Sequence, residues 1–308
     1  MIDSICFFNY FHNGDLFLSR EFVSIVSKKL KNQYNCFYAH HNHKKVIGDL
    51  DIPSFHIKQI SKLKDAYHRD KLFQIENTLF VNTWIGSYMK QFATDGFHCV
   101  QTGCNLIEYQ KIWDVIADVL SKKLEIDLSF SSKNVLDYVP VIDYEHYNIS
   151  KAKEFIDKNK DFKKIIISNG PVHSGQSFNA FNYDDLVNEL ALSYPNFQVI
   201  ATKKYQTELK NILFTEDIIG DKEGCDLNEI SYLSTFCDIL IGRNSGPFCY
   251  MNIKENIENK NKIMISLGNT DVENYLYKIN TPVNCQFFFD NNFQNLFESI
   301  KNALSDYT

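Results

Sequence analysis

Apolar residues follow two alternating rhythms along this chain, one typical of buried strands and the other of amphipathic helices. Residues 5–11 form an apolar, aromatic run, and the polar segment His12-Asn13-Gly14-Asp15 interrupts it. From Leu16 to Leu30 the apolar residues recur at helical spacing, and lysines near the end of this segment complement the helix dipole. The opening of the chain therefore predicts a strand, a loop and a helix, the first half of a β-α-β unit.

The same alternation continues to the C-terminus. Strand-like runs alternate with helical ones, which predicts parallel sheets with helices on both faces. Further strands are expected over 35–39, 79–85, 164–168, 197–202, 237–241, 262–267 and 284–289, with weaker candidates at 46–47 and 55–57, and further helices over 106–124, 149–159, 183–192, 227–236 and 292–304.

An extended segment near Pro140 separates the two halves of the pattern. The 308 residues suffice for two domains of ordinary size. We predict an α/β protein with two doubly wound, Rossmann-like domains, residues 1–147 and 148–308, that face each other across a cleft. The last helix could also pack back on the first domain.

Composition excludes several classes of protein. Hydrophobic residues make up 44% and charged residues 23%, the balance of a soluble globular protein. The net charge of −6 argues against a nucleic-acid partner. The eight cysteines form no Cys-x-x-Cys pair, and neither a signal-peptide pattern nor a membrane-spanning apolar run is visible. We therefore expect a cytoplasmic protein with free thiols.

The segment from Cys237 to Pro247 is the first candidate for chemistry. It reads as a buried strand, a small polar turn and a helix that begins at Pro247, where proline is favoured. Gly242 and Gly246 would let the backbone approach a ligand closely. The free N–H groups at such a helix start favour an anion, most often a phosphate. The alternative is an ordinary strand-to-helix turn capped by Ser245.

Polar turns also follow other predicted strands, and ligands of open α/β sheets bind beyond the carboxyl ends of the strands. Asp15 is the candidate general base, although it could simply cap the helix that follows. His12 is a second proton carrier, unless it is packed or faces solvent. The pair Asp49 and Asp51 and the histidines at 40, 41 and 43 could hold a metal, but chance and a solvated loop are the favoured interpretations, and we predict no metal site.

Three short motifs occur in order along the chain: Gly14-Asp15-Leu16, the strand and turn 165–170 with the helix from Tyr183, and the segment 226–247 with its Gly246-Pro247 turn. Together they resemble the lipopolysaccharide heptosyltransferase family of glycosyltransferases, which have the two-domain GT-B fold. The dinucleotide, Walker and nucleophile-elbow motifs are missing.

This resemblance implies an inverting, metal-independent hexosyl or heptosyl transferase that uses a nucleotide-diphosphate sugar as donor substrate and no cofactor. Asp15 matches the position of the family's catalytic base. Lys203, Lys204 and Arg243 are added as cations for the leaving diphosphate on chemical grounds. The predicted donor-binding residues are Ser168, Asn169, Gly170, Lys203, Lys204, Arg243, Asn244, Ser245, Gly246 and Pro247.

The turn departs from the family's Asp-Thr-Gly-Pro-Met-His, because Asn244 and Cys249 replace its Asp and His. The identity of the donor sugar is therefore open. The expected acceptor is a cell-surface glycan or its lipid-linked precursor, as in lipopolysaccharide biosynthesis, with peripheral contact at the inner membrane. Two alternatives are a nucleotide-sugar hydrolase or epimerase of similar fold, and a non-catalytic nucleotide-sugar binding protein.

Overall fold

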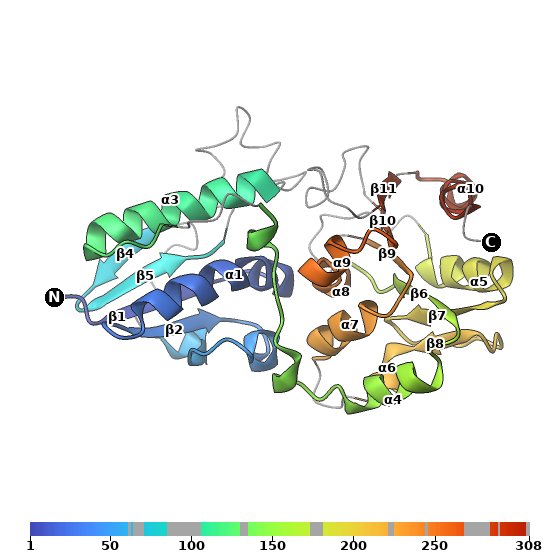
Figure 1. Cartoon of the computed structure of the whole chain (residues 1–308), viewed down its shortest axis with the longest axis horizontal. Helices are drawn as coiled ribbons and strands as arrows, with labels where there is room; N and C mark the ends of the chain where they lie inside the picture. Colours follow the sequence, from blue (N-terminus) through green and yellow to red (C-terminus); the bar gives the residue numbers. More distant parts are fainter. Residues whose placement is uncertain are drawn as a thin grey trace. The chain divides into compact units, whose positions relative to one another are not determined.

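The computed structural model describes residues 1–60, 63, 71–84, 106–129, 135–172, 181–220, 225–243, 246–267, 284–288 and 290–305. The chain forms two compact units, Met1–Asp143 and Tyr144–Thr308. Each unit has its own sheet with helices packed beside it (Figure 1).

The division between the units falls at residue 143, where we expected residue 147. The backbone N–H of Asp143 donates a 3.0 Å hydrogen bond to the carboxylate of Asp49, within the first unit. The next residue, Tyr144, shares a 3.0 Å hydrogen bond with the Ser231 hydroxyl, and its ring lies 5.1 Å from that of Tyr232. Two adjacent residues thus contact different units, which agrees with the position of the boundary.

The first unit is built on a five-stranded sheet with the order β3-β2-β1-β5-β4. Neighbouring strands are parallel except for β4 and β5. These two run antiparallel because only the turn 76–77 joins them, and Glu76 adopts the positive φ of 52° that suits a tight hairpin. The sequence pattern did not predict β4. The strands are β1 (Ser4–Asn9), β2 (Asn35–His40), β3 (Ser54–His56), β4 (Leu72–Ile75) and β5 (Thr78–Asn82).

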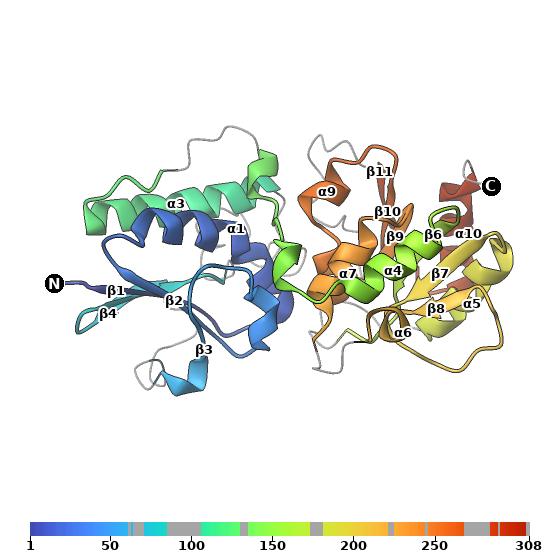
Figure 2. The ribbon, with the colours of Figure 1, turned by 60° about the horizontal axis from the view of Figure 1, so that its bottom comes forward.

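Two long helices, α1 (Asn13–Leu30) and α3 (Leu106–Leu124), lie side by side on one face of this sheet (Figure 2). The rings of Phe22 and Trp113 stack between them with centroids 4.8 Å apart. The other face carries a smaller apolar cluster around Phe8 and Phe80. Residues 46–47, a weak strand candidate, belong to a 3-10 helix instead. The described residues of this unit include the 3-10 helices η1 (Lys44–Ile47), η2 (Ile57–Gln59) and η6 (Val135–Tyr138).

The second unit has a six-stranded parallel sheet with the order β11-β10-β9-β6-β7-β8. Its strands are β6 (Lys163–Ser168), β7 (Phe197–Ala201), β8 (Ile212–Phe214), β9 (Ile239–Arg243), β10 (Ile263–Leu267) and β11 (Asn284–Phe288). Its helices are η7 (Tyr144–His146), α4 (Ser150–Lys158), α5 (Tyr183–Ser193), α6 (Thr215–Ile219), α7 (Leu227–Ser234), α8 (Gly246–Tyr250), α9 (Lys254–Ile257) and α10 (Phe293–Ala303).

The last helix, α10, packs on the sheet of the second unit. Its apolar residues Leu296, Phe297 and Ile300 belong to the same buried cluster as residues of α5 and of strands β6 to β10. The sequence left open that the last helix also packs back on the first domain, and that contact stays a prediction. None of the described helices is both long and apolar enough to cross a membrane.

The strand order gives each unit a topological switch point. In the second unit the chain runs outward from β6 to β7 and β8, then returns to β9 on the other side of β6. In the first unit it runs from β1 to β2 and β3, then crosses to the edge strand β4 and reaches β5 on the other side of β1. Open α/β sheets bind ligands at the carboxyl ends of such neighbouring strands. The candidate site residues are therefore sought beyond β6 and β9, and beyond β1 and β5.

Candidate functional site

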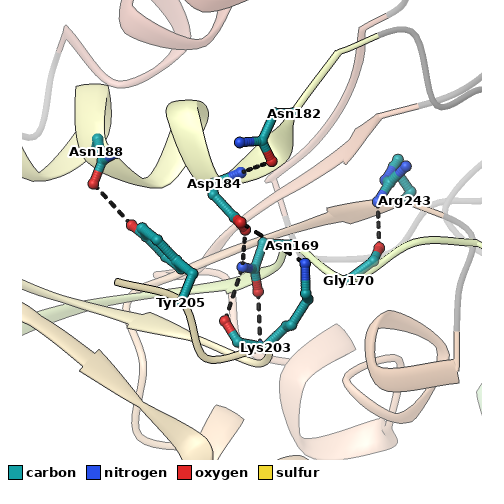
Figure 3. Close-up of polar contacts among 8 residues, drawn as sticks. All are labelled: Asn169, Gly170, Asn182, Asp184, Asn188, Lys203, Tyr205 and Arg243. Atoms are coloured by element: carbon teal, nitrogen blue, oxygen red, sulfur yellow. Dashed lines mark hydrogen bonds and ion pairs between the residues drawn. The ribbon is translucent and has the colours of Figure 1, made fainter. Parts of the chain in front are cut away.

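The switch point of the second unit lies where β6 and β9 end. Ser168 pairs with Gly242 in the register, so the residues after them leave the sheet close together. Arg243 is the last residue of β9 and is 1% exposed, whereas we expected it in the polar turn. Its guanidinium donates a hydrogen bond to the carbonyl oxygen of Gly170 (Figure 3). It also lies 3.6 Å from the centre of the Tyr183 ring.

These contacts give Arg243 a defined place in the site. Burial lowers the pKa of its guanidinium, and the contact with Tyr183 acts in the opposite direction. Arginine nevertheless stays protonated, because its ordinary pKa is far above neutral. The side chain therefore holds the backbone of Gly170 and stacks on the first residue of α5, as cation–π pairs do.

Asn169 connects three elements at the same switch point (Figure 3). Its Oδ1 accepts a 2.8 Å hydrogen bond from the backbone N–H of Lys203, just beyond β7. Its Nδ2 donates to the Lys203 carbonyl at 3.0 Å and to the carboxylate of Asp184, in the first turn of α5, at 2.7 Å. The whole amide is thus engaged within the protein, and it fixes the positions of Lys203 and Asp184.

The two neighbouring lysines differ in what they contact. The ammonium of Lys203 is 3.8 Å from an Asp184 oxygen, a loose ion pair, and half of its side chain is exposed. The ammonium of Lys204 donates a 2.6 Å hydrogen bond to Asp217 of α6, which raises its pKa. Lys203 is therefore the cation of the two that is more readily available to an anionic ligand.

The turn that follows β9 is described only in part. Asn244 and Ser245 lie outside the described residues, and Gly246 and Pro247 form the start of the five-residue helix α8. The close approach at Gly242 is explained by this helix, because a Cβ there would lie 2.6 Å from the Phe248 ring. Gly242 thus makes room for a side chain of the protein, whereas we expected it to make room for a ligand.

At the switch point of the first unit, Asp15 lies in the first turn of α1. The helix begins at Asn13, three residues before the expected start, and its N-cap residue is His12. The Asp15 carboxylate accepts a 3.1 Å hydrogen bond from the backbone N–H of His12, the reciprocal arm of a capping box. Asp15 therefore contributes to capping of α1.

The environment of Asp15 shifts its protonation. Burial raises the pKa of its carboxyl from 3.8 to about 6, against the smaller lowering effects of the His12 and Asp15 backbone N–H groups and of the His12 charge. His12 itself is exposed. A carboxyl with a pKa near 6 is ionised at neutral pH and accepts a proton more readily than an ordinary aspartate.

The weaker metal candidates do not form a common site. Asp49 pairs with the buried guanidinium of Arg20, whereas Asp51 is exposed and lies 3.9 Å from the Lys31 ammonium. His40 is buried at the end of β2, and burial lowers its pKa to about 4. We expected His40 in a solvated loop, and for this residue that expectation was wrong. Among the described residues, no three His, Cys, Asp or Glu side chains are grouped so that they could hold a metal ion.

Sequence reasoning missed two members of the second unit's site, Tyr183 and Asp184. Both open a helix that was predicted from Tyr183 onward, so the available signal was the position of that helix start directly after β6 in a β-α-β unit. It also missed the buried hydroxyls of Ser19, Tyr38 and Thr83 in the first unit. Their spacing in the sequence carries no signal, because only the sheet register brings them together.

Comparison with known proteins bears on the fold. No family model matches this sequence, and no curated protein matches it. Among solved structures, the chain has the fold of GT-B glycosyltransferases, with two α/β domains built on parallel sheets. The expected fold class is therefore confirmed.

Two similar structures illustrate this likeness, and each covers nearly the whole chain. A family 9 glycosyltransferase from Veillonella parvula is 13% identical, with 97% of this chain and 89% of that chain covered and a TM-score of 0.50. The heptosyltransferase WaaC of E. coli with ADP-2-deoxy-2-fluoro heptose is 7% identical, with 99% of this chain and 100% of that chain covered and a TM-score of 0.53. At such identities the likeness concerns the fold.

Proposed function

We propose that this protein is an inverting glycosyltransferase. It would move a hexosyl or heptosyl group from a nucleotide-diphosphate donor to a hydroxyl of a cell-surface glycan or of its lipid-linked precursor. The observation that carries the proposal is Asp15, a carboxylate at a switch point whose pKa is raised to about 6 by burial. A base of this kind is suited to take a proton from a sugar hydroxyl near neutral pH.

In the proposed reaction, Asp15 accepts the proton of the acceptor hydroxyl while that oxygen attacks the anomeric carbon of the donor. The bond from the anomeric carbon to the diphosphate oxygen breaks, and the nucleoside diphosphate leaves with the bonding electron pair. A single displacement of this kind inverts the anomeric centre. His12 is the second candidate for the proton transfer, because it adjoins Asp15 in the sequence and is exposed.

The donor is assigned to the switch point of the second unit. The exposed ammonium of Lys203 would stabilise the negative charge that develops on the leaving diphosphate. Arg243 and Asn169 would act by fixing Gly170, Asp184 and Lys203. The remaining donor residues predicted from the sequence, Ser168, Gly170, Lys204, Asn244, Ser245, Gly246 and Pro247, stay part of this proposal.

Similar structures support a nucleotide-diphosphate donor. Two WaaC structures contain ADP or ADP-2-deoxy-2-fluoro heptose. The present chain lacks the Asp and His of the family's turn, so the nucleotide and sugar have to be found by experiment. We expect ADP, UDP, GDP or CDP to raise the melting temperature of the protein, because a ligand that binds only the folded state stabilises it.

The decisive variant is Asp15→Asn, assayed with the donor identified by that screen. We expect transfer to fall by about 10²- to 10⁴-fold, the range lost with a general base, while the affinity for the nucleoside diphosphate stays unchanged. Asp118→Asn is the matched control, because Asp118 is an exposed carboxylate on α3 of the same unit.

The result that overturns the base assignment is transfer by Asp15→Asn at the rate of the unmodified protein. Donor breakdown that proceeds equally without any acceptor would instead identify a hydrolase or epimerase. Binding of a nucleotide sugar without any turnover would identify a binding protein.

A further inference from the structure

A continuous row of buried polar side chains lies beneath the first turns of α1. The hydroxyl of Tyr38, on β2, is 2.7 Å from the Ser19 hydroxyl of α1 and 2.5 Å from the Thr83 hydroxyl beyond β5. The Thr83 hydroxyl also accepts a 3.2 Å hydrogen bond from the amide of Asn9, the last residue of β1. All four side chains are almost fully buried. A buried polar network of this kind holds its members in a single arrangement when every member is satisfied.

Each hydroxyl of this row has one proton and can accept further hydrogen bonds. Ser19 is within donating distance of the Leu16 carbonyl at 2.9 Å, and Thr83 of the Phe8 carbonyl at 3.2 Å. In the two contacts of Tyr38 either oxygen can be the donor. The row thus connects Asn9, Thr83, Tyr38 and Ser19 with the Leu16 carbonyl.

Both ends of the row contact the segment that carries Asp15. At one end, the Ser19 hydroxyl binds the carbonyl of Leu16, the residue that follows Asp15. At the other end, the Asn9 Oδ1 accepts a 2.9 Å hydrogen bond from the backbone N–H of Phe11. Phe11 precedes His12, whose own N–H binds the Asp15 carboxylate. The row therefore spans the loop and the helical turn between which the carboxylate is held.

We infer that Tyr38 is a positioning residue for Asp15, and that the hydroxyl row through Thr83, Tyr38 and Ser19 holds the carboxylate in its place at the switch point. This inference rests on the proposed function in that it takes Asp15 as the base. The row itself does not touch the reacting atoms.

A shift in the protonation of Asp15 would report on this role. In the described residues, the titratable groups that act on Asp15 are His12 from its own loop and Tyr38 from β2. Burial is the main cause of the raised pKa of Asp15. When the hydroxyl row is interrupted, the first turn of α1 is less firmly fixed and water reaches the Asp15 carboxylate. The pKa of Asp15 then moves back toward that of an ordinary aspartate.

Tyr38→Phe is the variant to test, because both of its neighbours keep an acceptor. Ser19 still binds the Leu16 carbonyl, and Thr83 can turn to the Phe8 carbonyl. Ser19→Ala is the second variant. Ser27→Ala is the matched control, since Ser27 is also buried on α1 and donates to a carbonyl three residues back, at 3.2 Å, far from the row.

The experiment follows the side-chain carboxyl carbons of aspartate by NMR, in the full chain without ligand, between pH 3.5 and 8. The Asp15 signal is assigned by its absence in Asp15→Asn. We expect Tyr38→Phe and Ser19→Ala to lower its titration midpoint by about 0.5–1 pH unit, because partial hydration removes part of the burial effect. Ser27→Ala should leave the midpoint in place.

Unchanged midpoints in both variants would overturn the inference and reduce the row to a purely structural role. If Tyr38→Phe does not fold, Ser19→Ala carries the test alone. The titration needs no substrate, so it tests the positioning role independently of the proposed function. If the variants shift the midpoint but the protein transfers no sugar, the proposed glycosyltransferase activity is rejected and the positioning role of Tyr38 is supported. Where transfer is found, the acid limb of its pH profile should shift by the same amount in Tyr38→Phe.

Discussion

The two units place an asparagine at the same point of their topology and surround it with different chemistry. Asn9 ends β1, and Asn169 directly follows β6, so each stands where the first strand of its unit reaches the switch point. In both, the side-chain oxygen accepts a backbone N–H and the side-chain nitrogen donates onward. Asn9 leads to neutral hydroxyls, whereas Asn169 leads to the carboxylate of Asp184 beside the ammonium of Lys203.

This difference suits the two switch points to different tasks. The row of hydroxyls near Asp15 carries no charge. In the described part of the chain, the effects that lower the pKa of Asp15 come from His12 and from backbone N–H groups, and burial outweighs them, so this pKa stays high. At the other switch point the carboxylate of Asp184 is balanced by Lys203 and by the Asn169 amide. Neutral neighbours, such as the hydroxyl row near Asp15, keep the pKa of a carboxyl high and so favour proton exchange. Charged neighbours, such as Asp184 beside Lys203, hold a cation in place and so favour binding of an anion.

The largest effect is expected from removing these two asparagines. Asn169→Ala loses three hydrogen bonds, one of them to a carboxylate, and should lower the free energy of unfolding by about 3–4 kcal/mol. Asn9→Ala loses two neutral hydrogen bonds and should lower it by about 1–2 kcal/mol.

The two units can be followed separately during denaturation in urea. Both tryptophans, Trp84 and Trp113, belong to the first unit, so their fluorescence reports its unfolding, whereas circular dichroism reports both units. Asn9→Ala should shift the fluorescence transition, and Asn169→Ala should shift the dichroism alone. An equal cost of the two substitutions would remove the distinction between the neutral and the charged scaffold.

A second, smaller effect is the dependence of the free energy of unfolding on pH. The folded state holds the Asp15 proton up to a pKa of about 6, and the unfolded state releases it near 3.8. Between these values the folded state binds more protons, so the free energy of unfolding falls as pH rises. The loss amounts to about 2 kcal/mol, less than the full shift of the pKa implies, because Asp15 is only half-buried and solvent screens part of the effect. Urea denaturation followed by tryptophan fluorescence, from pH 4 to pH 7, measures it.

Asp15→Asn should abolish this part of the pH dependence, because the amide does not titrate and resembles the protonated acid. The curves of the two proteins should be closest near pH 4 and diverge toward pH 7, with the variant the more stable. Parallel curves over the whole range would mean that the carboxylate is hydrated in the folded state.

The sequence was sufficient for what depends on local patterns. The strands expected over 164–168 and 262–267 agree within one residue with β6 and β10. They could be predicted because a strand buried on both faces needs nearly continuous apolar residues. The Gly14-Asp15-Leu16 motif directed attention to a carboxylate that lies at a switch point. Both inferences use neighbours in the sequence, and neither needs the register between strands.

The features that were missed depend on contacts between distant residues. Ser19 lies on α1, Tyr38 on β2 and Thr83 directly after β5, and only the tertiary structure joins their hydroxyls. Arg243 was expected in a turn, but its guanidinium finds an acceptor in Gly170 and an aromatic face in Tyr183, and so it remains in the strand. Gly242 was interpreted as a ligand contact because Phe248 is not visible as its neighbour in the sequence.

The smallest effect expected here distinguishes the two lysines of the charged switch point. Lys203→Met keeps the apolar stem and removes the ammonium, which should weaken binding of the nucleoside diphosphate about tenfold, as for the loss of one charge-assisted contact. Lys204→Met should weaken it only about twofold, because the Lys204 ammonium is already bonded to Asp217 at 2.6 Å. Lys158→Met, on the exposed face of α4, is the control without effect. Calorimetric titration at two salt concentrations measures all three, and equal losses for Lys203 and Lys204 would show that the pairing with Asp217 does not withhold Lys204 from the ligand.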